Sequence, residues 1–551
     1  MDVPIGFVGI GGVLKSRVRR DSGRGQGCKC SMDDGVGGGF GSPVPLKGKT
    51  SPELFFKLNA ELQAAVNDER YGDAARLRDE LVVVRSNDPL LSARDTLKNA
   101  LDEEDYKTAA TLRDRVRELM RQRSEGNGFS LNRISHLLVR EGSVTKVVST
   151  AADGSVPISH TKFSEKNSAY QQPSWSPSGD YLAVVKVSVV DPKQRRLLVF
   201  NLFENELVVD WNIEETPFYF FWSPCGTVLT YLSSKNGDLT CECVDVQTRE
   251  RRPQFGEGRP FFYDMKQTDT IWGVAHIGSK SVVECFKLFE APEKRESILL
   301  TESPGSFKSP QWHPNPSLEG GSQALYMVKD GTSSILKCTD IVTGESANLI
   351  RIGNGASVFS MSPDGSRLAI LVRGERAEEL TVVDGPFDAK DQRNMEDSPF
   401  TVNLSVPFSR TLAFFWSPDS KKLLYLSEPM DSISQYHCRW NVYDFSRNVL
   451  ARFEEHAPSK IFLTQIVPFF DQYSRSHRIW SADSSAFCYS AKSERLGGKR
   501  GPTFSWVQHL PTEMGDNKED NEDAPRRIIK GPETPIPTPL LTGSELCSWS
   551  M

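Results

Sequence analysis

Ser174-Trp175-Ser176-Pro177-Ser178-Gly179-Asp180-Tyr181-Leu182 combines a tight turn with the start of an apolar strand, and the chain repeats this pattern. In the turn, proline fixes φ at the second position and glycine tolerates the left-handed final position. Further copies, some of them degenerate, stand at Trp222, Trp312, Met361, Trp416 and Trp480. A unit repeated at intervals of some tens of residues predicts a solenoid, a propeller or an array.

The spacing of these copies decides the architecture. Trp222 lies 47 residues after Trp175, whereas the gap of 90 residues from Trp222 to Trp312 is close to two units. Tyr263, in Phe261-Phe262-Tyr263-Asp264, supplies a worn copy inside that gap, which gives seven units. The first unit contains four short apolar runs, and a four-stranded unit that recurs predicts a β-propeller. We therefore predict an all-β propeller over residues 134–551, with seven blades and with eight blades as the alternative.

Three segments outside the regular repeats bear on how the ring closes. Residues 135–149 are a predicted hairpin that either pairs with C-terminal strands or begins an eighth blade. Ile528-Ile529 is predicted as the last strand of the seventh unit. Residues 511–526 are acidic and expected to form a disordered loop, and the proline-rich stretch 532–539 is expected to be extended.

A different pattern, with a helical period, occupies residues 51–123. Apolar residues recur every three or four positions, as in Ala74, Leu77, Leu81 and Val84. The design returns thirty-five residues later, because Tyr71-Gly72-Asp73-Ala74-Ala75-Arg76-Leu77-Arg78-Asp79 matches Tyr106-Lys107-Thr108-Ala109-Ala110-Thr111-Leu112-Arg113-Asp114. Each copy is predicted to be two antiparallel helices joined by an acidic turn, with the tyrosine over the apolar seam. The chain thus places a small α-helical hairpin module before the propeller.

The first fifty residues have the composition of a leader. Residues 1–50 are rich in glycine, and in the first thirty positions six basic residues face only two aspartates. A basic, acid-poor leader is typical of organelle transit peptides, and Cys28-Lys29-Cys30-Ser31-Met32 resembles the processing region of chloroplast transit peptides. We therefore expect the chloroplast stroma, with a disordered N-terminus on a cytoplasmic protein as the alternative. Residues 124–133 are predicted to be a linker.

Composition argues against several classes of protein. The net charge of −6 gives no basic footprint for nucleic acid, and no apolar run approaches the roughly 20 residues that span a bilayer. The ten cysteines include no C-x-x-C pair, and the eight histidines show no zinc-ligand spacing. A G-x-S-x-G elbow in an α/β domain is also missing. We therefore predict no catalytic, cofactor-binding or metal-binding residues.

Two resemblances follow from these motifs. The helical pattern "xYxxAAxLRDxL" resembles the UVR motif of the UvrB and UvrC repair proteins, of Clp-protease regulators and of several plastid proteins. The pattern "W-S-P-D-G-x-x-L" is similar to TolB-type propeller repeats and to propellers fused to prolyl-oligopeptidase-like enzymes, more than to other WD-repeat-like blades. Together they indicate a tandem UVR protein fused to a TolB-like propeller, of the plant plastid type. In the UVR family the hairpin is a protein-docking element.

The resemblances imply a non-enzymatic adaptor for protein–protein interaction. The hairpin module would dock one partner, such as a Clp-type chaperone or protease component, and the propeller would be a platform for another. The candidate partner-binding residues are Tyr71, Arg78, Asp79, Tyr106, Arg113 and Asp114. One alternative is an enzyme or small-ligand binder with its site at the channel mouth, which convergent carboxylates or histidines would favour. The other is a nucleic-acid-associated protein, through the UVR resemblance.

Overall fold

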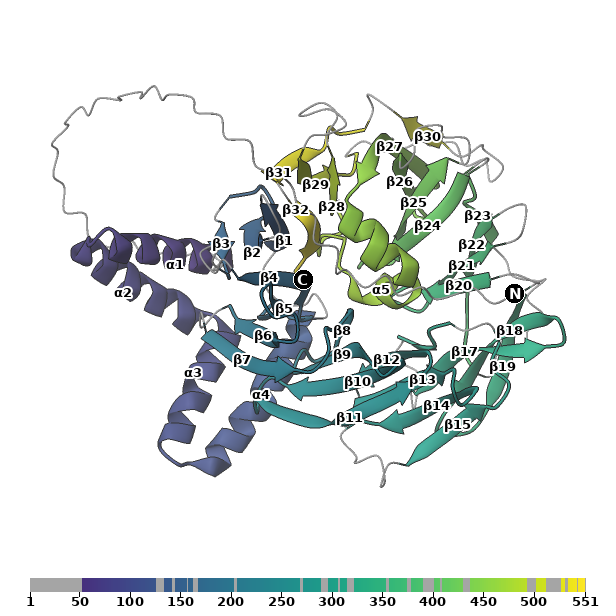
Figure 1. The fold of residues 1–551 in the computed structure, drawn as a ribbon, viewed down its shortest axis with the longest axis horizontal. Helices are drawn as coiled ribbons and strands as arrows, with labels where there is room; N and C mark the ends of the chain where they lie inside the picture. The colour runs from purple at the N-terminus through teal and green to yellow at the C-terminus, as the bar shows by residue number, and fades with distance from the viewer. Residues whose placement is uncertain are drawn as a thin grey trace. The chain divides into compact units, whose positions relative to one another are not determined.

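Helices precede an all-β ring in this protein, as the computed structural model shows (Figure 1). The structure describes residues 52–124, 133–140, 144–155, 157–161, 167–202, 206–267, 271–288, 296–305, 308–314, 322–352, 356–373, 378–389, 401–406, 409–429, 437–492, 502–511, 527–530, 534–542 and 544–550. The predicted leader, most of the predicted linker and most of the predicted acidic loop lie outside these residues. The fold class, a β-propeller preceded by a small helical module, is confirmed.

The helical module consists of two hairpins. The first contains α1 (Pro52–Asn67) and α2 (Tyr71–Asn87), and the second contains α3 (Pro89–Asp102) and α4 (Tyr106–Ser124). The two acidic turns have the same backbone conformation, because Glu69 and Glu104 occupy the left-handed region at φ 58° and 59°. The thirty-five-residue repeat in sequence is therefore a repeat in structure.

The buried face of α2 is the one that its spacing predicts. It buries Ala74, Leu77, Leu81 and Val84. The expectation for the tyrosines is wrong: Tyr71 and Tyr106 are 70% and 68% exposed and do not cover the seam. Each stands at the first position of its helix, directly after the turn, where the side chain projects away from the partner helix.

The propeller is built from antiparallel blades whose strands follow one another in chain order. The first and second blades contain β4 (Ser168–Trp175), β5 (Tyr181–Ser188), β6 (Arg195–Asn201), β7 (Glu206–Ile213), β8 (Tyr219–Trp222), β9 (Val228–Lys235), β10 (Asp238–Asp245) and β11 (Glu250–Gly258). The third and fourth contain β12 (Phe261–Gln267), β13 (Ile271–Ile277), β14 (Val282–Lys287), β15 (Ser297–Thr301), β16 (Gln311–Trp312), β17 (Gln323–Asp330), β18 (Ser333–Asp340) and β19 (Ser346–Ile352). The fifth and sixth contain β20 (Ala356–Met361), β21 (Arg367–Arg373), β22 (Glu378–Asp384), β23 (Thr401–Asn403), β24 (Ser409–Trp416), β25 (Lys422–Pro429), β26 (Cys438–Asp444) and β27 (Val449–Pro458). Tyr263, the predicted worn copy, lies buried in β12 at the start of the third blade.

The two ends of the β region form a further blade. The seventh repeat supplies β28 (Ala486–Lys492), β29 (Thr503–His509) and β31 (Thr538–Thr542). After it, β32 (Ser544–Trp549) pairs with β1 (Arg133–Arg140), which continues into β2 (Val144–Ala151) and β3 (Ile158–Ser159). The hairpin predicted at 135–149 thus fulfils both alternatives, because it pairs with a C-terminal strand and also forms part of an eighth blade. Seven blades come from the seven repeats, the chain ends add an eighth, and the eight-bladed alternative is the one that the structure has.

The prediction for Ile528-Ile529 is wrong. β30 (Arg527–Lys530) pairs in parallel with β27, with Ile528 opposite Leu450 and Ile529 opposite Ala451. It therefore extends the sixth blade, where the outer edge of β27 is open and Ile529 can be buried. The outer strand of the seventh blade is β31, which begins within the proline-rich stretch and pairs with β29.

Four of the recurring tryptophans connect their blade to the preceding one. The indole N–H of Trp222 donates to Ser174 O, that of Trp416 to Ser360 O, and that of Trp480 to Phe415 O, at 3.4, 3.0 and 3.1 Å. In each case the acceptor immediately precedes the equivalent position of the neighbouring blade. Trp175 follows the same rule, because its indole donates to Ser548 O at 3.2 Å. Trp549 therefore occupies the tryptophan position of the eighth blade.

The turn after Trp549 is completed by the other end of the β region. In the first blade, Ser176 N donates to Tyr181 O and Ser176 Oγ accepts from Tyr181 N, at 2.9 and 3.0 Å. Ser550 makes the same two bonds with Arg133, at 2.7 Å from Ser550 N to Arg133 O and 2.9 Å from Arg133 N to Ser550 Oγ. The ring is thus closed by an eighth copy of the repeat, split between residues 417 positions apart.

Candidate functional site

The predicted partner-binding residues lie on the exposed sides of the hairpins. Arg78 donates to Asp79 Oδ1 through Nε and Nη2, at 3.1 and 2.9 Å, and Arg113 pairs with Asp114 at 3.2 and 3.1 Å. All four of these side chains are at least half exposed. Exposed ion pairs contribute little to stability, so these side chains can contact a partner at little cost to the fold. The structure thus pairs each of these arginines with the aspartate that follows it in the sequence.

An apolar stripe runs along the exposed face of α2 beside these charges. Tyr71, Arg78 and Val82 follow one another at i, i+7 and i+11, which places them on one face of the helix. Val82 and its neighbour Val83 are 60% and 59% exposed. Sequence reasoning missed both valines, although the run Leu81-Val82-Val83-Val84 was a usable signal, because a helix cannot bury four consecutive side chains against one partner.

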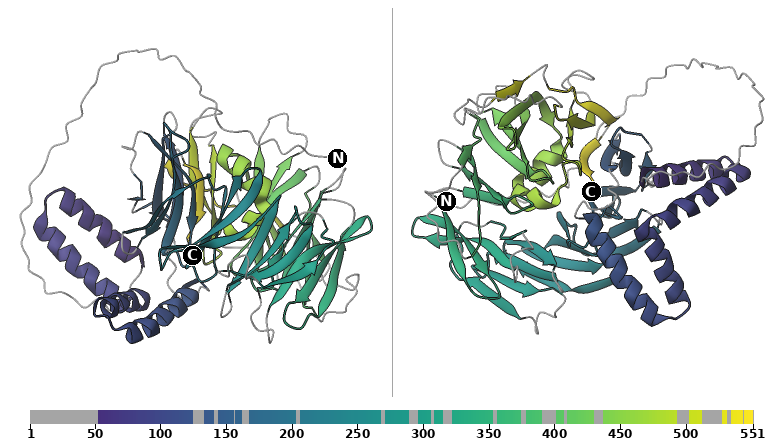
Figure 2. Two further views of the ribbon diagram at one scale, coloured as in Figure 1. Left: turned by 60° about the horizontal axis from the view of Figure 1, so that its bottom comes forward. Right: turned by 180° about the vertical axis from the view of Figure 1, so that it is seen from behind.

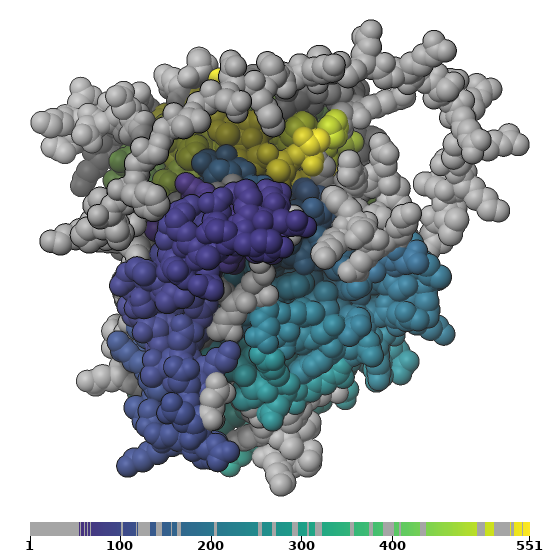
Figure 3. All heavy atoms as spheres, turned by 90° about the vertical axis from the view of Figure 1, so that its left-hand side faces the viewer, coloured from purple at the N-terminus to yellow at the C-terminus, as the bar shows by residue number. Residues whose placement is uncertain are grey.

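The second hairpin differs from the first at these positions. Thirty-five residues after Val82 and Val83 the sequence has Arg117 and Glu118. This hairpin packs on the propeller, because Leu90 and Val116 belong to the apolar cluster of the first two blades. The exposed apolar stripe is therefore a property of the first hairpin, whose purple residues form a ridge in Figure 3.

A buried ion pair fixes the second hairpin to the turn of the first blade. Arg94 Nη2 lies 3.3 Å from Asp180 Oδ2, and both side chains are less than 10% exposed. The guanidinium also lies over the ring of Tyr181, 5.6 Å from its centroid. Asp180 and Tyr181 belong to the stretch that defines the repeat, so the helical module docks on the repeat itself.

The centre of the ring is filled by an insertion in the seventh blade. Pro458 and Trp480 both pair with β28, and the residues between them leave the sheet. We call residues 459–477 the channel plug; it contains a π-helix (Phe462–Ile466), a 3-10 turn (Val467–Phe469) and α5 (Phe470–Ser476). Figures 1 and 2 show α5 within the ring of sheets. The channel is thus occupied by the protein's own chain.

The side chain of Gln472 holds the plug by hydrogen bonding to the backbone of β12, as a neighbouring strand would. Its Oε1 accepts from Tyr263 N at 3.3 Å, and its Nε2 donates to Tyr263 O at 2.9 Å and to Ser309 Oγ at 3.0 Å. The backbone carbonyl of Gln472 accepts from the hydroxyl of Tyr219 at 3.2 Å. Because β12 faces the channel, its peptide groups at Tyr263 would otherwise be buried without partners, at a cost of about 1–3 kcal/mol for each.

Replacing Gln472 by methionine is expected to lower the free energy of unfolding by about 2–3 kcal/mol. Methionine keeps the length of the side chain but leaves Tyr263 N and O unsatisfied. Gln465→Met, at a half-buried position of the same plug, is the control and should change the value by less than about 1 kcal/mol. Urea denaturation of both variants checks this, and equal effects would show that the strand-like pairing is not what holds the plug.

A second anchor is an ion pair between the plug and β12. Asp264, 2% exposed, accepts from Trp312 N at 2.8 Å and from Met265 N at 2.9 Å, and it also binds Arg475. Burial raises the pKa of Asp264, whereas Arg475 and the two backbone amides favour its charged form. The groups that donate to this carboxylate all belong to the protein itself, so the ion pair between Asp264 and Arg475 serves to hold α5 in place.

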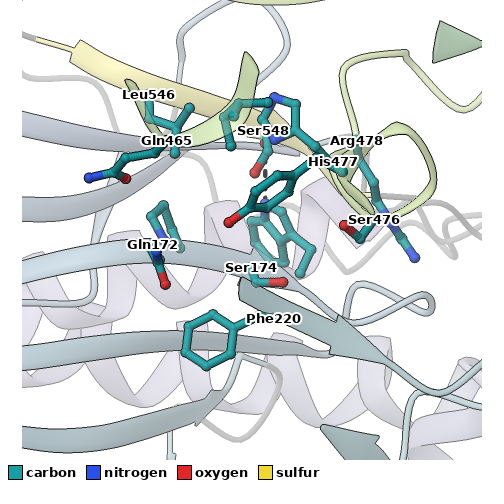
Figure 4. Close-up of a pocket in the computed structure, with 13 residues that line it drawn as sticks. Gln172, Ser174, Phe220, Gln465, Ser476, His477, Arg478, Leu546 and Ser548 are labelled. Atoms are coloured by element: carbon teal, nitrogen blue, oxygen red, sulfur yellow. Dashed lines mark hydrogen bonds between the residues drawn. The ribbon is translucent and has the colours of Figure 1, made fainter. Parts of the chain in front are cut away.

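Small cavities remain where the plug meets the strands. One of 30 Å³ lies between β4, β8, β32 and the plug, bordered by Gln172, Ser548 and Arg478 (Figure 4). This volume suffices for about one or two waters. Arg478 donates to Ser176 O and Pro177 O at 3.1 and 3.2 Å, and burial lowers its pKa to about 10. The cavity is too small for an organic ligand.

The channel mouth on the side of the repeated turns is apolar. A cavity of 480 Å³ lies there, lined by aromatic residues, by one histidine, His477, by Arg475 and Arg478, and by the turn prolines Pro177, Pro224, Pro314, Pro363 and Pro418. Among the described residues, no aspartate or glutamate lines it, and no group of three or more Cys, His, Asp or Glu is placed to hold a metal ion. None of the helices in the described part is long and apolar enough to cross a membrane.

Comparison with known proteins identifies the first hairpin. Residues 57–86 match the UVR family, described as the UvrB/uvrC motif. Among proteins of curated function, none matches the chain.

Several solved propellers are similar at low identity. TolB from Acinetobacter baumannii is 15% identical with a TM-score of 0.31, over 58% of this chain and 62% of that one. A prolyl endopeptidase is 10% identical with a TM-score of 0.42, over 78% and 53%. The propeller of the Trilobed protease from Pyrococcus furiosus is 12% identical with a TM-score of 0.36, over 62% and 94%. The chain spans less than two thirds of the first two proteins, and the propeller assignment rests on its own strand pairing. The chain carries a UVR motif at residues 57–86, followed by a β-propeller.

Proposed function

We propose that this protein is a non-enzymatic adaptor that docks a partner protein on the exposed face of α2. The observation that carries the proposal is the stripe of Tyr71, Arg78 and Val82, in which an aromatic ring and a valine stay largely exposed on the face of α2 opposite its buried residues. Large exposed apolar side chains gathered on one element favour an interaction site. Tyrosine and arginine are also enriched among residues that dominate binding energy.

The second hairpin has a supporting role in this proposal. Its Tyr106, Arg113 and Asp114 are exposed like their counterparts, and they would contact the partner at the edge of the interface. The ion pair between Arg94 and Asp180 holds this hairpin on the first blade. Docking on α2 would therefore place the partner at a defined distance from the propeller.

We base the proposed partner class on the UVR resemblance. UVR hairpins resemble those of Clp-protease regulators, so the proposed partner is a Clp-type chaperone or protease component. The propeller would offer a platform for another protein, and the apolar, proline-lined mouth supports this role. Nucleic acid is the weaker candidate, because the chain has a net charge of −6.

Affinity purification with the full chain as bait tests the proposal. A chloroplast extract should yield a Clp-type component with the wild-type chain, and much less with the double variant Tyr71→Ala/Val82→Ala. The control is Val342→Ala, a 70% exposed valine in the fourth blade, which should capture as much as the wild type. Recovery of nothing beyond background from wild type would overturn the partner assignment.

The proposed location is the chloroplast stroma, on the composition of residues 1–50. A full-length fluorescent fusion is expected to accumulate in chloroplasts, and a fusion that lacks residues 1–50 is expected to remain outside them. Identical cytosolic signals from both fusions would contradict this location.

A further inference from the structure

The apolar cavity at the channel mouth has the size of a ligand site. Its volume of 480 Å³ lies within the roughly 300–1,000 Å³ of pockets that hold small organic molecules. The accessible part of its wall includes turn prolines that are exposed or half-buried, namely Pro224, Pro314, Pro363 and Pro418. Proline side chains lose almost no rotamer freedom when they are covered. The wall is therefore an apolar surface that a ligand can cover at little entropic cost to the protein.

One cation in this wall has hydrogen-bonding capacity that the fold does not use. Arg478 follows the plug and is half-buried, and its Nη1 donates to Ser176 O and Pro177 O. In the described part of the chain, its Nε and Nη2 donate to no acceptor, and neither is among the polar atoms that burial closes off. Figure 4 shows the guanidinium directed away from Gln172 and Ser548, which border the smaller cavity. Both nitrogens are thus available to a ligand in the mouth.

The charges around the mouth leave one positive charge in excess. Arg475 is paired with Asp264, whereas Arg478 forms no ion pair with any residue that the structure describes. His477 is neutral at neutral pH because burial lowers its pKa to about 4, and Arg478, with a pKa of about 10, stays charged. An anionic group is therefore the ligand feature that this wall can satisfy, through charge-assisted hydrogen bonds from Nε and Nη2 of Arg478.

We propose that the channel mouth binds a small apolar monocarboxylate. Its carboxylate accepts from Nε and Nη2 of Arg478, and its apolar part lies against the turn prolines. A cation would meet the arginines without a carboxylate to pair with. A dicarboxylate would leave its second charge in an apolar site without a partner, which is costly. This site is separate from α2, so the proposal does not depend on partner docking there.

Isothermal titration calorimetry of the full chain with 2-naphthoate tests this proposal. 2-Naphthoate is expected to bind saturably. The neutral 2-naphthamide, which has nearly the same shape, should bind at least about 10-fold more weakly, because it loses the charge-assisted hydrogen bonds. Acetate, which lacks the apolar part, should also bind at least about 10-fold more weakly. Equal affinity of either analogue would overturn the ligand class, and absence of saturable heat with 2-naphthoate and octanoate alike would overturn the site.

Substitutions assign the binding to this cavity. Arg478→Met should weaken 2-naphthoate binding at least about 10-fold and leave that of 2-naphthamide unchanged, whereas Arg478→Lys keeps the charge and should lose less. Pro363→Glu adds a carboxylate at an exposed turn position that accepts most residues, and should weaken 2-naphthoate binding about 5-fold or more.

A matched control removes one positive charge outside the cavity. Arg351→Gln, at a side chain 69% exposed on β19, should leave 2-naphthoate binding unchanged. Because Arg478→Met and Pro363→Glu lie on different elements, one of them tests the site if the other fails to fold. Unchanged affinity for 2-naphthoate in either folded variant would overturn the proposal.

Discussion

Trp549→Ala is expected to destabilise the protein by about 3–5 kcal/mol. Trp549 is 1% exposed and stands where β32 closes the ring onto β1. Its loss removes the largest side chain of the apolar cluster that joins Ile134, Ala486 and Val507 across the last two blades. Because a marginally stable domain has only about 5–15 kcal/mol in total, this change should be visible as a large shift in urea denaturation.

A tryptophan outside the closure provides the control. Trp211, in the outer strand of the first blade, is half-buried and its ring is covered by Arg251. Trp211→Ala should cost clearly less than Trp549→Ala, and only Trp549→Ala should speed hydrogen exchange in β1 and β2. Equal losses from both variants, with unchanged exchange in β1, would contradict the split-repeat closure.

Acid is expected to destabilise the protein, and its three most deeply buried histidines contribute on the order of 4 kcal/mol to this loss between pH 6 and pH 5. Three buried histidines, His136, His276 and His313, are 0%, 4% and 4% exposed. Burial lowers the pKa of His136 to about 3 and of the other two to about 4. In the unfolded chain they take up protons near pH 6.5. The folded state therefore binds fewer protons, and the stability present above pH 6.5 is lost as the pH falls toward 4.

The carboxyl groups of Asp264 and Asp471 act in the opposite direction. Burial raises the pKa of each, so their protonation favours the folded state as the pH falls. The variant His313→Gln separates the two effects, because it should remove the contribution of one histidine, on the order of 1 kcal/mol, and leave the carboxyl groups unchanged. The free energy of unfolding at pH 6 and pH 5 measures this. An equal value at both pH values in the wild type, or an unchanged difference in His313→Gln, would contradict the assignment.

The spacing of the repeats predicted most of the blades. The interval that departs from this spacing marks a feature that the prediction missed. The repeat positions from Trp175 to Trp480 became the seven blades that follow the helices. The interval of 64 residues from Trp416 to Trp480 is longer than the 47 from Trp175 to Trp222, and the excess is the channel plug. The plug resisted prediction because its apolar residues pack against strands far away in sequence, where no local period reveals them.

The eighth copy was missed for a different reason. Ser548-Trp549-Ser550 repeats Ser174-Trp175-Ser176, but no strand follows it in sequence because its continuation is Arg133 at the other end. On the hairpins, periodicity identified the buried face of α2 correctly. It could not show that Tyr71 stays exposed, because a residue beside a turn is placed by the turn's backbone and not by the helical period.

Direct titration of the purified full chain with a purified Clp-type chaperone component tests the adaptor function most directly. The account predicts saturable binding by the wild type and a loss of about 30-fold or more in Tyr71→Ala/Val82→Ala, since residues that dominate an interface contribute about 2 kcal/mol or more. Val342→Ala should bind as tightly as the wild type. No binding by the wild type, or equal binding by the double variant, would contradict docking of this partner on the exposed face of α2.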